Sequence, residues 1–561
     1  MSFDTLIKNV TLIDGSASLP YVADLAVRAD RIAAIGTLLG DAKHTIDGSG
    51  LSLMPGIIDN HTHYDAQVTW DSWCSPSVAL GVTTAVIGNC GFTIAPCKPQ
   101  DRDRTMANLT QVEGMSIEVL RAGIDWQFET IPQYLSFLER RGSALNLAAF
   151  VGHSSLRTFV MGDDAAKRSA TPAEVAAMRA LLLEGMQAGA VGFATSTSPA
   201  HNGQGGQPMP SRLADDDELR TLVGSLKDGG RGVFMLTKGG HTKISFLEEL
   251  AALSRRPVVV AALLHSNTNP GVVFDELDQI GAANARGNRM VGAISPCPLT
   301  NDFTMRSPYP VEGLKSWQAA LGLSAERYKA VLRDPGFRQT VRDEIGAPTT
   351  FRLFNGEWNK VNVVEVSKPQ HRYYEQQNVA QLALAAGVDP LDFMLDLALD
   401  ENLDTLFTAV LLNSDEAAVA RMLRHPASLV SLSDAGAHLT FFNDAGFGLH
   451  LLGHWVRRLS VLSIEQAVAK LTSVPARLFG IADRGELRVG AYADLMLFDS
   501  ATVDRGAKER VADLPGGGKR LLTPAIGIEG VWVNGTRVAD RHGPCVLDAG
   551  LPGKLLRKFD A

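Results

Sequence analysis

Runs of apolar residues alternate with amphipathic stretches through the middle of the chain. Short apolar runs bounded by glycine or polar residues are typical of strands that are buried on both faces. We predict eight such strands, at 51–58, 82–88, 146–152, 190–195, 231–236, 257–264, 290–294 and 428–433. A capping box with proline at the first helical position, Thr171-Pro172-Ala173-Glu174, predicts a helix that ends at Gly189. The repeated alternation favours a (β/α)8 TIM barrel over an open doubly wound sheet.

Both ends of the chain carry a different, β-type pattern. The first fifty residues read as short strands with turns, and so do 485–499 and 525–540, the latter with the hairpin signal Asn534-Gly535. Because neither end has enough strands to bury a face, we predict that both termini pair into one small β-sandwich domain. The predicted domains are 1–54 and 480–561 for the two parts of the sandwich and 55–479 for the barrel, with an irregular insertion around 295–427.

Composition and charge narrow the class of protein. The 561 residues are 45% hydrophobic and carry a formal net charge of -8, which predicts a compact protein without a nucleic-acid partner. No run of about 18 apolar residues predicts a membrane span, and the acidic start of the chain does not resemble a signal peptide. Five scattered cysteines are too few for a disulfide framework, so we expect a cytoplasmic setting. The sequence does not determine the oligomeric state, and a homo-oligomer is one of the open alternatives.

Metal-capable side chains follow several predicted strands, at the end where barrel enzymes carry their reacting groups. His61 and His63 come directly after the first strand. Residues i and i+2 of an extended backbone point to the same side, so both imidazoles can face one metal ion. The other such side chains are Cys90 after the second strand, His153 after the third, His265 after the sixth, and Asp434 and His438 after the eighth.

Each of the single residues also has an ordinary structural interpretation. A lone histidine after a strand, such as His153 or His438, is more often a hydrogen-bonded structural residue. A lone cysteine such as Cys90 is more often buried packing. Asp434 could simply cap the next helix, although its place in the last strand favours catalysis.

Five longer motifs contain most of these residues: PGIIDNHTHYDAQ at 55–67, GVTTAVIGNCGFTIAP at 81–96, FVGHSSLR at 150–157, SLSDAGAH at 431–438 and TSVPARLFGIADRGELRVGAYADLMLFD at 472–499. Together they resemble the metal-dependent amidohydrolase superfamily, and within it the D-aminoacylase, or N-acyl-D-amino-acid deacylase, group. The last motif resembles the return into the small β-sandwich of that superfamily.

The resemblance implies an enzyme, a hydrolase acting on small molecules through carbon–nitrogen bonds other than peptide bonds. It implies that His61, His63, Cys90 and His265 are metal ligands and that Asp434 ligates or faces the metal as general base. A metal-activated water would cleave the amide of an N-acyl amino acid or a related N-acyl compound. Imidazole with thiolate suits Zn²⁺, as one or two ions, and another divalent metal stays open.

Two departures from the group concern the ligands and the substrate. Where relatives usually carry a histidine after the fifth strand, this chain has Thr237 and Lys238. Either His241 reaches in from the loop, or Lys238 contributes in carboxylated form, or one metal is bound with fewer protein ligands, which we favour.

The second departure follows His265, where deacylases commonly have a lysine two residues on and this chain has Asn267. Losing that cation removes a charge-assisted contact worth about 1.5–3 kcal/mol, so a substrate carboxylate is not assured. The candidate substrate-binding residues are His153, Arg157, Lys238 and His438. The same fold and metal could instead serve a cyclic amide, an ester or lactone, or a C–C bond. A third alternative is a non-catalytic member of the superfamily, but the presence of Asp434 argues against it.

Overall fold

The computed structural model describes residues 2–203, 206–349, 352–548 and 550–560, and the chain divides into two compact units. The larger unit comprises the chain up to Leu263, Asp275–Pro296 and the chain from Ala420 onward. The smaller unit comprises Leu264–Phe274 and Cys297–Val419. Among the described residues, no helix combines the length and the apolar character needed to cross a membrane.

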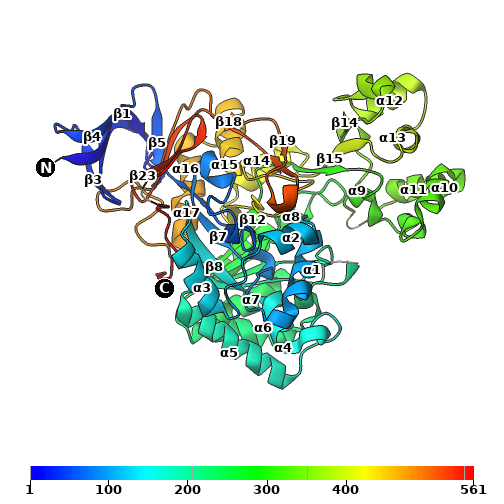
Figure 1. The fold of residues 1–561 in the computed structure, drawn as a ribbon, viewed down its shortest axis with the longest axis horizontal. Coiled ribbons are helices and arrows are strands. Elements are labelled where there is room, and N and C mark those ends of the chain that lie inside the picture. The colour runs from blue at the N-terminus through cyan, green and yellow to red at the C-terminus, as the bar shows by residue number, and fades with distance from the viewer. Residues whose placement is uncertain (1, 204–205, 350–351, 549, 561) are drawn as a thin grey trace. The chain divides into compact units, whose positions relative to one another are not determined.

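Eight parallel strands form the central sheet of the larger unit (Figure 1). In hydrogen-bonded order they are β6 (Ile57–Asp59), β7 (Val82–Ile87), β8 (Asn146–Gly152), β9 (Gly192–Ser196), β10 (Val233–Thr237), β11 (Val258–Ala261), β12 (Met290–Ile294) and β16 (Ser428–Val430). The two end strands also meet, because Thr62 and Ala435 form a parallel bridge and Asn60 Nδ2 donates to the carbonyl of Val430 at 3.0 Å. The predicted (β/α)8 barrel is confirmed, with all eight predicted strands.

Helices lie between these strands, as the alternation predicted, and three more follow the last of them. They are α1 (Arg102–Val112), α2 (Ile117–Gly123), α3 (Ile131–Arg141), α4 (His153–Met161), α5 (Pro172–Ala188), α6 (Asp216–Gly224), α7 (Ile244–Ser254), α8 (Val272–Ala285), α14 (Glu416–Arg424), α15 (Phe447–His450), α16 (Ile464–Leu471) and α17 (Ser473–Phe479). α5 begins at the predicted capping box, where Thr171 and Glu174 exchange hydrogen bonds, and it ends at Gly189 with φ 110°.

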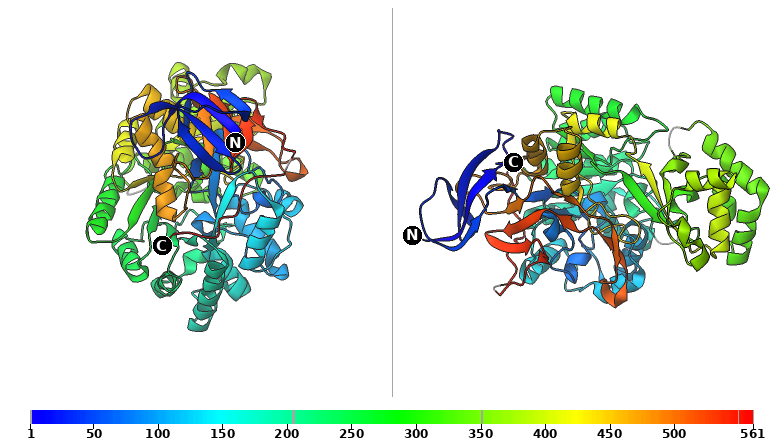
Figure 2. Two further views of the ribbon diagram at one scale, coloured as in Figure 1. Left: turned by 90° about the vertical axis from the view of Figure 1, so that its left-hand side faces the viewer. Right: turned by 90° about the horizontal axis from the view of Figure 1, so that it is seen from above.

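Strands from both ends of the chain share one nine-stranded sheet (Figure 2). Its strands are β1 (Phe3–Leu12), β2 (Tyr21–Arg28), β3 (Arg31–Gly36), β4 (Ala42–Asp47), β5 (Ser52–Pro55), β17 (Leu495–Phe498), β22 (Ile528–Val533), β23 (Thr536–Asp540) and β24 (Gly543–Pro544). The two ends join where β5 pairs antiparallel with β17. Asn534 and Gly535 form the predicted hairpin turn, both with positive φ. The expected pairing of the termini is therefore confirmed.

One predicted strand is divided in two. The apolar run 51–58 contributes β5 to the terminal sheet and β6 to the barrel, and Gly56 separates them. A Cβ atom at Gly56 would lie 2.1 Å from the side chain of Thr83, so only glycine allows this close passage. The pair Pro55-Gly56 inside the run was the available signal, because this dipeptide marks turns.

The prediction of an irregular stretch around 295–427 is wrong. The smaller unit contains the antiparallel sheet β13 (Leu299–Phe303), β15 (Leu406–Leu412) and β14 (Val361–Glu365), with helices α9 (Tyr309–Glu312), α10 (Ala325–Arg333), α11 (Pro335–Gly346), α12 (Val379–Ala386) and α13 (Pro390–Asp400). Side chains of Asp334, Asn378 and Asp389 accept hydrogen bonds at three of the helix starts. Trp317, Phe337 and Phe407 belong to a separate hydrophobic core in this unit.

Candidate metal centre

Two histidines, a cysteine and an aspartate meet at the C-terminal end of the barrel strands. His61 and His63 follow β6, with ring centroids 5.4 Å apart. Cys90 Sγ lies 3.5 Å from His61 Nε2 and 3.9 Å from His63 Nε2. Asp434 Oδ1 lies 3.1 Å from His61 Nε2 and 3.7 Å from His63 Nε2. Residues that we predicted from three separate strand ends thus lie within contact distance of one another.

The loop after β7 presents Cys90 through a tight backbone turn. Cys90 has φ 58°, between Gly88 at φ 85° and Gly91 at φ 77°. Asn89 Nδ2 secures the turn by donating to the carbonyl of Val86 at 2.8 Å. A Cβ atom at Gly91 would lie 2.6 Å from the carbonyl oxygen of Ala194, so the turn packs directly on the neighbouring strand. Cys90 is therefore held rigidly, and burial raises the pKa of its thiol.

Charge pairing dominates the electrostatics of this group. Burial alone would raise the pKa of Asp434, but the neighbouring His61 and His63 hold it well below its ordinary value. Burial lowers the pKa of His61 to about 4. For His63 the opposing carboxylates prevail, and Glu113 with Asp434 raises its pKa well above the ordinary value against the effect of burial. The Glu113 carboxylate follows α1, is 2% exposed, and lies 3.4 Å from His63 Nδ1.

These side chains line a cavity of about 70 Å³. The lining residues are His61, His63, Cys90, Phe92, Val112, His201, Thr237, Ala262, Leu432, Asp434 and His438. His61, His63 and Cys90 form the group best suited to a metal, because their donor atoms all lie within 4.8 Å of one another. Two imidazoles and one thiol are a donor set that fits zinc or a similar cation.

A model of the Amidohydrolase family matches residues 44–539 of the chain. The chain belongs to this family. Among its relatives, the D-aminoacylase of Alcaligenes xylosoxydans xylosoxydans is 32% identical over 549 residues, which cover 96% of this chain and 94% of that protein. The N-acyl-D-aspartate deacylase of the same organism is 30% identical over 573 residues, which cover 100% of this chain and 96% of that protein.

Solved structures agree with this assignment. The N-acyl-D-glutamate deacylase from Bordetella bronchiseptica, complexed with zinc and a phosphonate inhibitor, is 26% identical with a TM-score of 0.66, and the match covers 100% of each chain. The predicted resemblance to the amidohydrolase superfamily and its deacylase group is confirmed, and with it the prediction of a deacylase-like hydrolase.

In this amidohydrolase Thr237 lines the cavity at the end of β10, and its Oγ1 lies 3.1 Å from Cys90 Sγ. Lys238 does not line the cavity, and its Nζ donates to Glu276 Oε1 at 2.7 Å. His241 is exposed and does not line it either. A hydroxyl thus stands beside the metal-binding group at the end of β10.

The other predicted residues lie in different surroundings. His438 lines the cavity, and its Nδ1 is buried without a hydrogen-bond partner in the described part of the chain. His153 and Arg157 do not line the cavity. His153 Nε2 lies 2.8 Å from Glu218 Oε1, Arg157 Nη1 donates to the same oxygen at 2.7 Å, and all three side chains are almost fully buried. This geometry is that of a structural ion-pair network.

His265 belongs to the smaller unit. Its backbone N–H donates to Asn413 Oδ1 at 2.8 Å, and its Nδ1 is buried without a partner among the described residues. Its role as a metal ligand stays a prediction.

Two residues of the cavity region were not predicted. Glu113 comes at the end of α1, and His201 comes several residues after β9. We examined side chains directly after strands, and neither residue stands there. The buried, acid-terminated helix after the Cys90 loop was the one available signal for Glu113.

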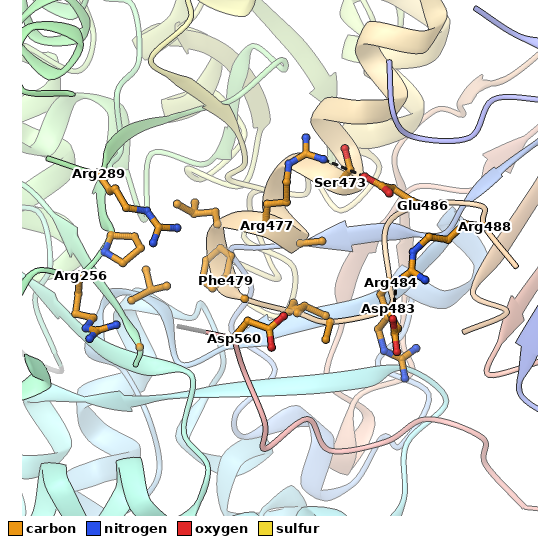
Figure 3. A pocket seen from close by; sticks show the side chains of 18 residues that line it. Arg256, Arg289, Ser473, Arg477, Phe479, Asp483, Arg484, Glu486, Arg488 and Asp560 are labelled. Carbon is orange, nitrogen blue, oxygen red and sulfur yellow. Dashed lines mark hydrogen bonds and ion pairs between the residues drawn. The ribbon is translucent and has the colours of Figure 1, made fainter. Parts of the chain in front are cut away.

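A larger hollow of about 280 Å³ lies at the opposite, N-terminal end of the barrel strands (Figure 3). Five arginines and three acidic residues line it: Arg256, Arg289, Arg477, Arg484, Arg488, Asp483, Glu486 and Asp560. Arg477 pairs with Glu486 and Arg488 with Asp483. Because barrel enzymes carry their chemistry at the C-terminal end, the smaller cavity is the candidate site.

Proposed function

We propose that this amidohydrolase cleaves the amide bond of an N-acyl amino acid or a related N-acyl compound with the aid of a bound divalent metal. The observation that carries the proposal is the convergence of His61, His63, Cys90 and Asp434 on one buried cavity. Relatives named as D-aminoacylase and N-acyl-D-aspartate deacylase align over nearly the whole chain, which supports the choice of an N-acyl substrate.

The donor set supports Zn²⁺ as the metal, as one or two ions. His61, His63 and Cys90 would hold it, with Asp434 and, by prediction, His265 as further ligands. A bound divalent cation supplies Lewis acidity and activates water at neutral pH. A small-molecule substrate, the absence of nucleic-acid and membrane partners, and a cytoplasmic setting remain our predictions.

Asp434 is the proposed general base. Its lowered pKa keeps the carboxylate ionised at neutral pH, and its 20% exposed side chain lies at the cavity. It can accept a proton from the attacking water and deliver it to the leaving nitrogen. His61 and His63 stabilise the negative charge of this carboxylate.

One observation favours a second candidate. The described residues that line the cavity include no lysine or arginine, so neither of these side chains is there to bind a substrate carboxylate. A cyclic amide, an ester or lactone, or a C–C bond in an uncharged substrate is therefore the alternative.

The test uses purified protein, either loaded with zinc or stripped with a chelator. We expect hydrolysis of at least one member of a panel of N-acyl-D-amino acids by the zinc-loaded form, and its loss on chelation or in His61→Ala. Inactivity across the panel together with activity on a cyclic amide or lactone favours the second candidate. Equal activity with and without metal contradicts the proposal.

A further inference from the structure

His201 lines the candidate cavity without belonging to the proposed metal-binding group. It comes from the loop after β9. Its imidazole packs edge-to-face against Phe92, with centroids 4.9 Å apart, and Phe92 also stacks on His63 at 6.2 Å. His201 is therefore an imidazole that lines the cavity beside the metal-binding group without being part of it.

The loop holds His201 in place through its backbone. The N–H of His201 donates to the carbonyl of Ser198 at 3.1 Å, and its own carbonyl accepts from Met209 N at 3.2 Å. Arg212 Nη1 donates to the same carbonyl at 3.1 Å. These bonds fix the backbone at His201, so the direction of its ring depends on the side-chain partner.

That partner is the hydroxyl of Ser196. Ser196 Oγ accepts from the N–H of Ser198 at 3.1 Å, and its one proton has two acceptors within reach, His201 Nδ1 at 2.7 Å and the carbonyl of Thr237 at 3.3 Å. When the hydroxyl donates to Thr237, the contact with His201 is one in which Nδ1–H donates. A neutral imidazole with its proton on Nδ1 carries its lone pair on Nε2.

The ring also stays neutral. Burial, together with the neighbouring His438 and His63, lowers the pKa of His201 to about 3. With the proton on Nδ1, Nε2 is a hydrogen-bond acceptor, and an acceptor in a small cavity selects a ligand that carries a donor. The ligand atoms of His61, His63 and Cys90 belong to the metal-binding group, and the Thr237 hydroxyl contacts Cys90.

We propose that His201 carries its proton on Nδ1, and that its Nε2 accepts the N–H group of the substrate's scissile secondary amide and so forms a subsite for the leaving nitrogen. This inference rests on the proposed function. The hydrogen bond would distinguish an amide substrate from an ester. A bound metal would not, because it would polarise the carbonyl of both, whereas only the amide presents an N–H.

The test compares a matched pair of substrates: an N-acyl amino acid that the wild type hydrolyses, and the corresponding O-acyl hydroxy acid. We expect His201→Ala to lower kcat/KM for the amide about tenfold, the effect of one lost hydrogen bond in a buried site. The ester should change less than about twofold. His201→Gln, which retains an acceptor oxygen, should recover part of the amide activity, and Ser196→Ala should lose part of it.

Two measurements separate this role from a structural one. Zinc content and the Tm of His201→Ala should match those of the wild type, and His542→Ala, an exposed histidine in the terminal sheet, serves as the matched control. Equal losses on amide and ester, or a loss of zinc, overturn the inference and leave the proposed function standing. A zinc-loaded wild type without activity on any N-acyl substrate contradicts the proposed function itself.

Discussion

At the scale of single residues, the cavity combines groups whose ionisation is set by their neighbours. Asp434 is ionised because two imidazoles lie within 3.1 Å and 3.7 Å of its Oδ1. A buried carboxylate, that of Glu113, lies on the other side of His63, 3.4 Å from its Nδ1. Its negative charge helps to raise the pKa of His63. The ionisation of the site is thus set by residues that need not touch the substrate.

The general-base role of Asp434 is testable by Asp434→Asn. We expect kcat to fall by about 10² to 10⁴-fold, because the amide cannot accept the proton of the attacking water. The measurement is kcat at saturating zinc, with the zinc content determined in parallel. If the variant retains zinc and keeps kcat within tenfold of the wild type, Asp434 is not the base.

Arg157 provides the second test at this scale. Arg157→Met leaves the buried Glu218 carboxylate without its strongest partner, so we expect a loss of about 3–5 kcal/mol in the free energy of unfolding at pH 7. The double variant with Glu218→Gln removes both charges and should recover much of that loss. A raised KM with an unchanged Tm would instead show that Arg157 binds substrate.

The same pair predicts a pH dependence. His153 and Arg157 hold the pKa of Glu218 below its ordinary value of 4.5 against the effect of burial. The stability that this carboxylate contributes is present above about pH 4.5 and is lost as pH falls through its lower folded pKa. The deficit of Arg157→Met should therefore shrink below about pH 4.5, where the isolated carboxyl takes up a proton. Urea unfolding at pH 7 and pH 4 checks this, and a constant deficit contradicts it.

At the scale of elements, the turn after β7 is the most constrained part of the site. Gly91→Ala combines a positive φ with a contact to the backbone of β9, whereas Gly50→Ala has nearly the same φ, 80°, in open space. We expect Gly50→Ala to cost about 1 kcal/mol and Gly91→Ala distinctly more. Gly91→Ala should also weaken zinc binding, because Cys90 must shift. Tm values and a zinc competition titration provide the comparison, and equal effects of the two variants would contradict it.

Much of the barrel could be predicted because buried parallel strands leave uninterrupted apolar runs, and a capping box marks the start of α5. Ligand candidates such as His61 and Asp434 could be predicted because barrel topology fixes where strand ends meet. Glu113 and His201 could not, since a loop can bring a residue to the cavity from any distance along the chain. The smaller unit was missed although its strand β15, LFTAVLL, is an apolar run of the same kind, because nothing in such a run shows which sheet it joins.

At the scale of the whole molecule, the larger unit depends on both ends of the chain. Trp532 on β22 is 2% exposed within the core of the terminal sheet. A chain that ends at Asp499 would lack β22, β23 and β24, and β17 would lose one of its two neighbours. We expect this truncated protein to be insoluble or to unfold without a cooperative transition, as measured by circular dichroism on heating. Cooperative unfolding at the Tm of the full chain would contradict this.

The pairing of β5 with β17 also constrains how the molecule is made. Ribosomes add about 5–20 residues per second, so β5 emerges tens of seconds before its partner at Leu495–Phe498 exists. During synthesis the first barrel strand, one glycine away, is attached to a segment without its final neighbour. Contacts between such distant segments form late and slowly. The His61–His63 pair, just beyond β6, is therefore expected to reach its final position only after nearly the entire chain has been translated, so the proposed metal would bind late in the synthesis of the protein.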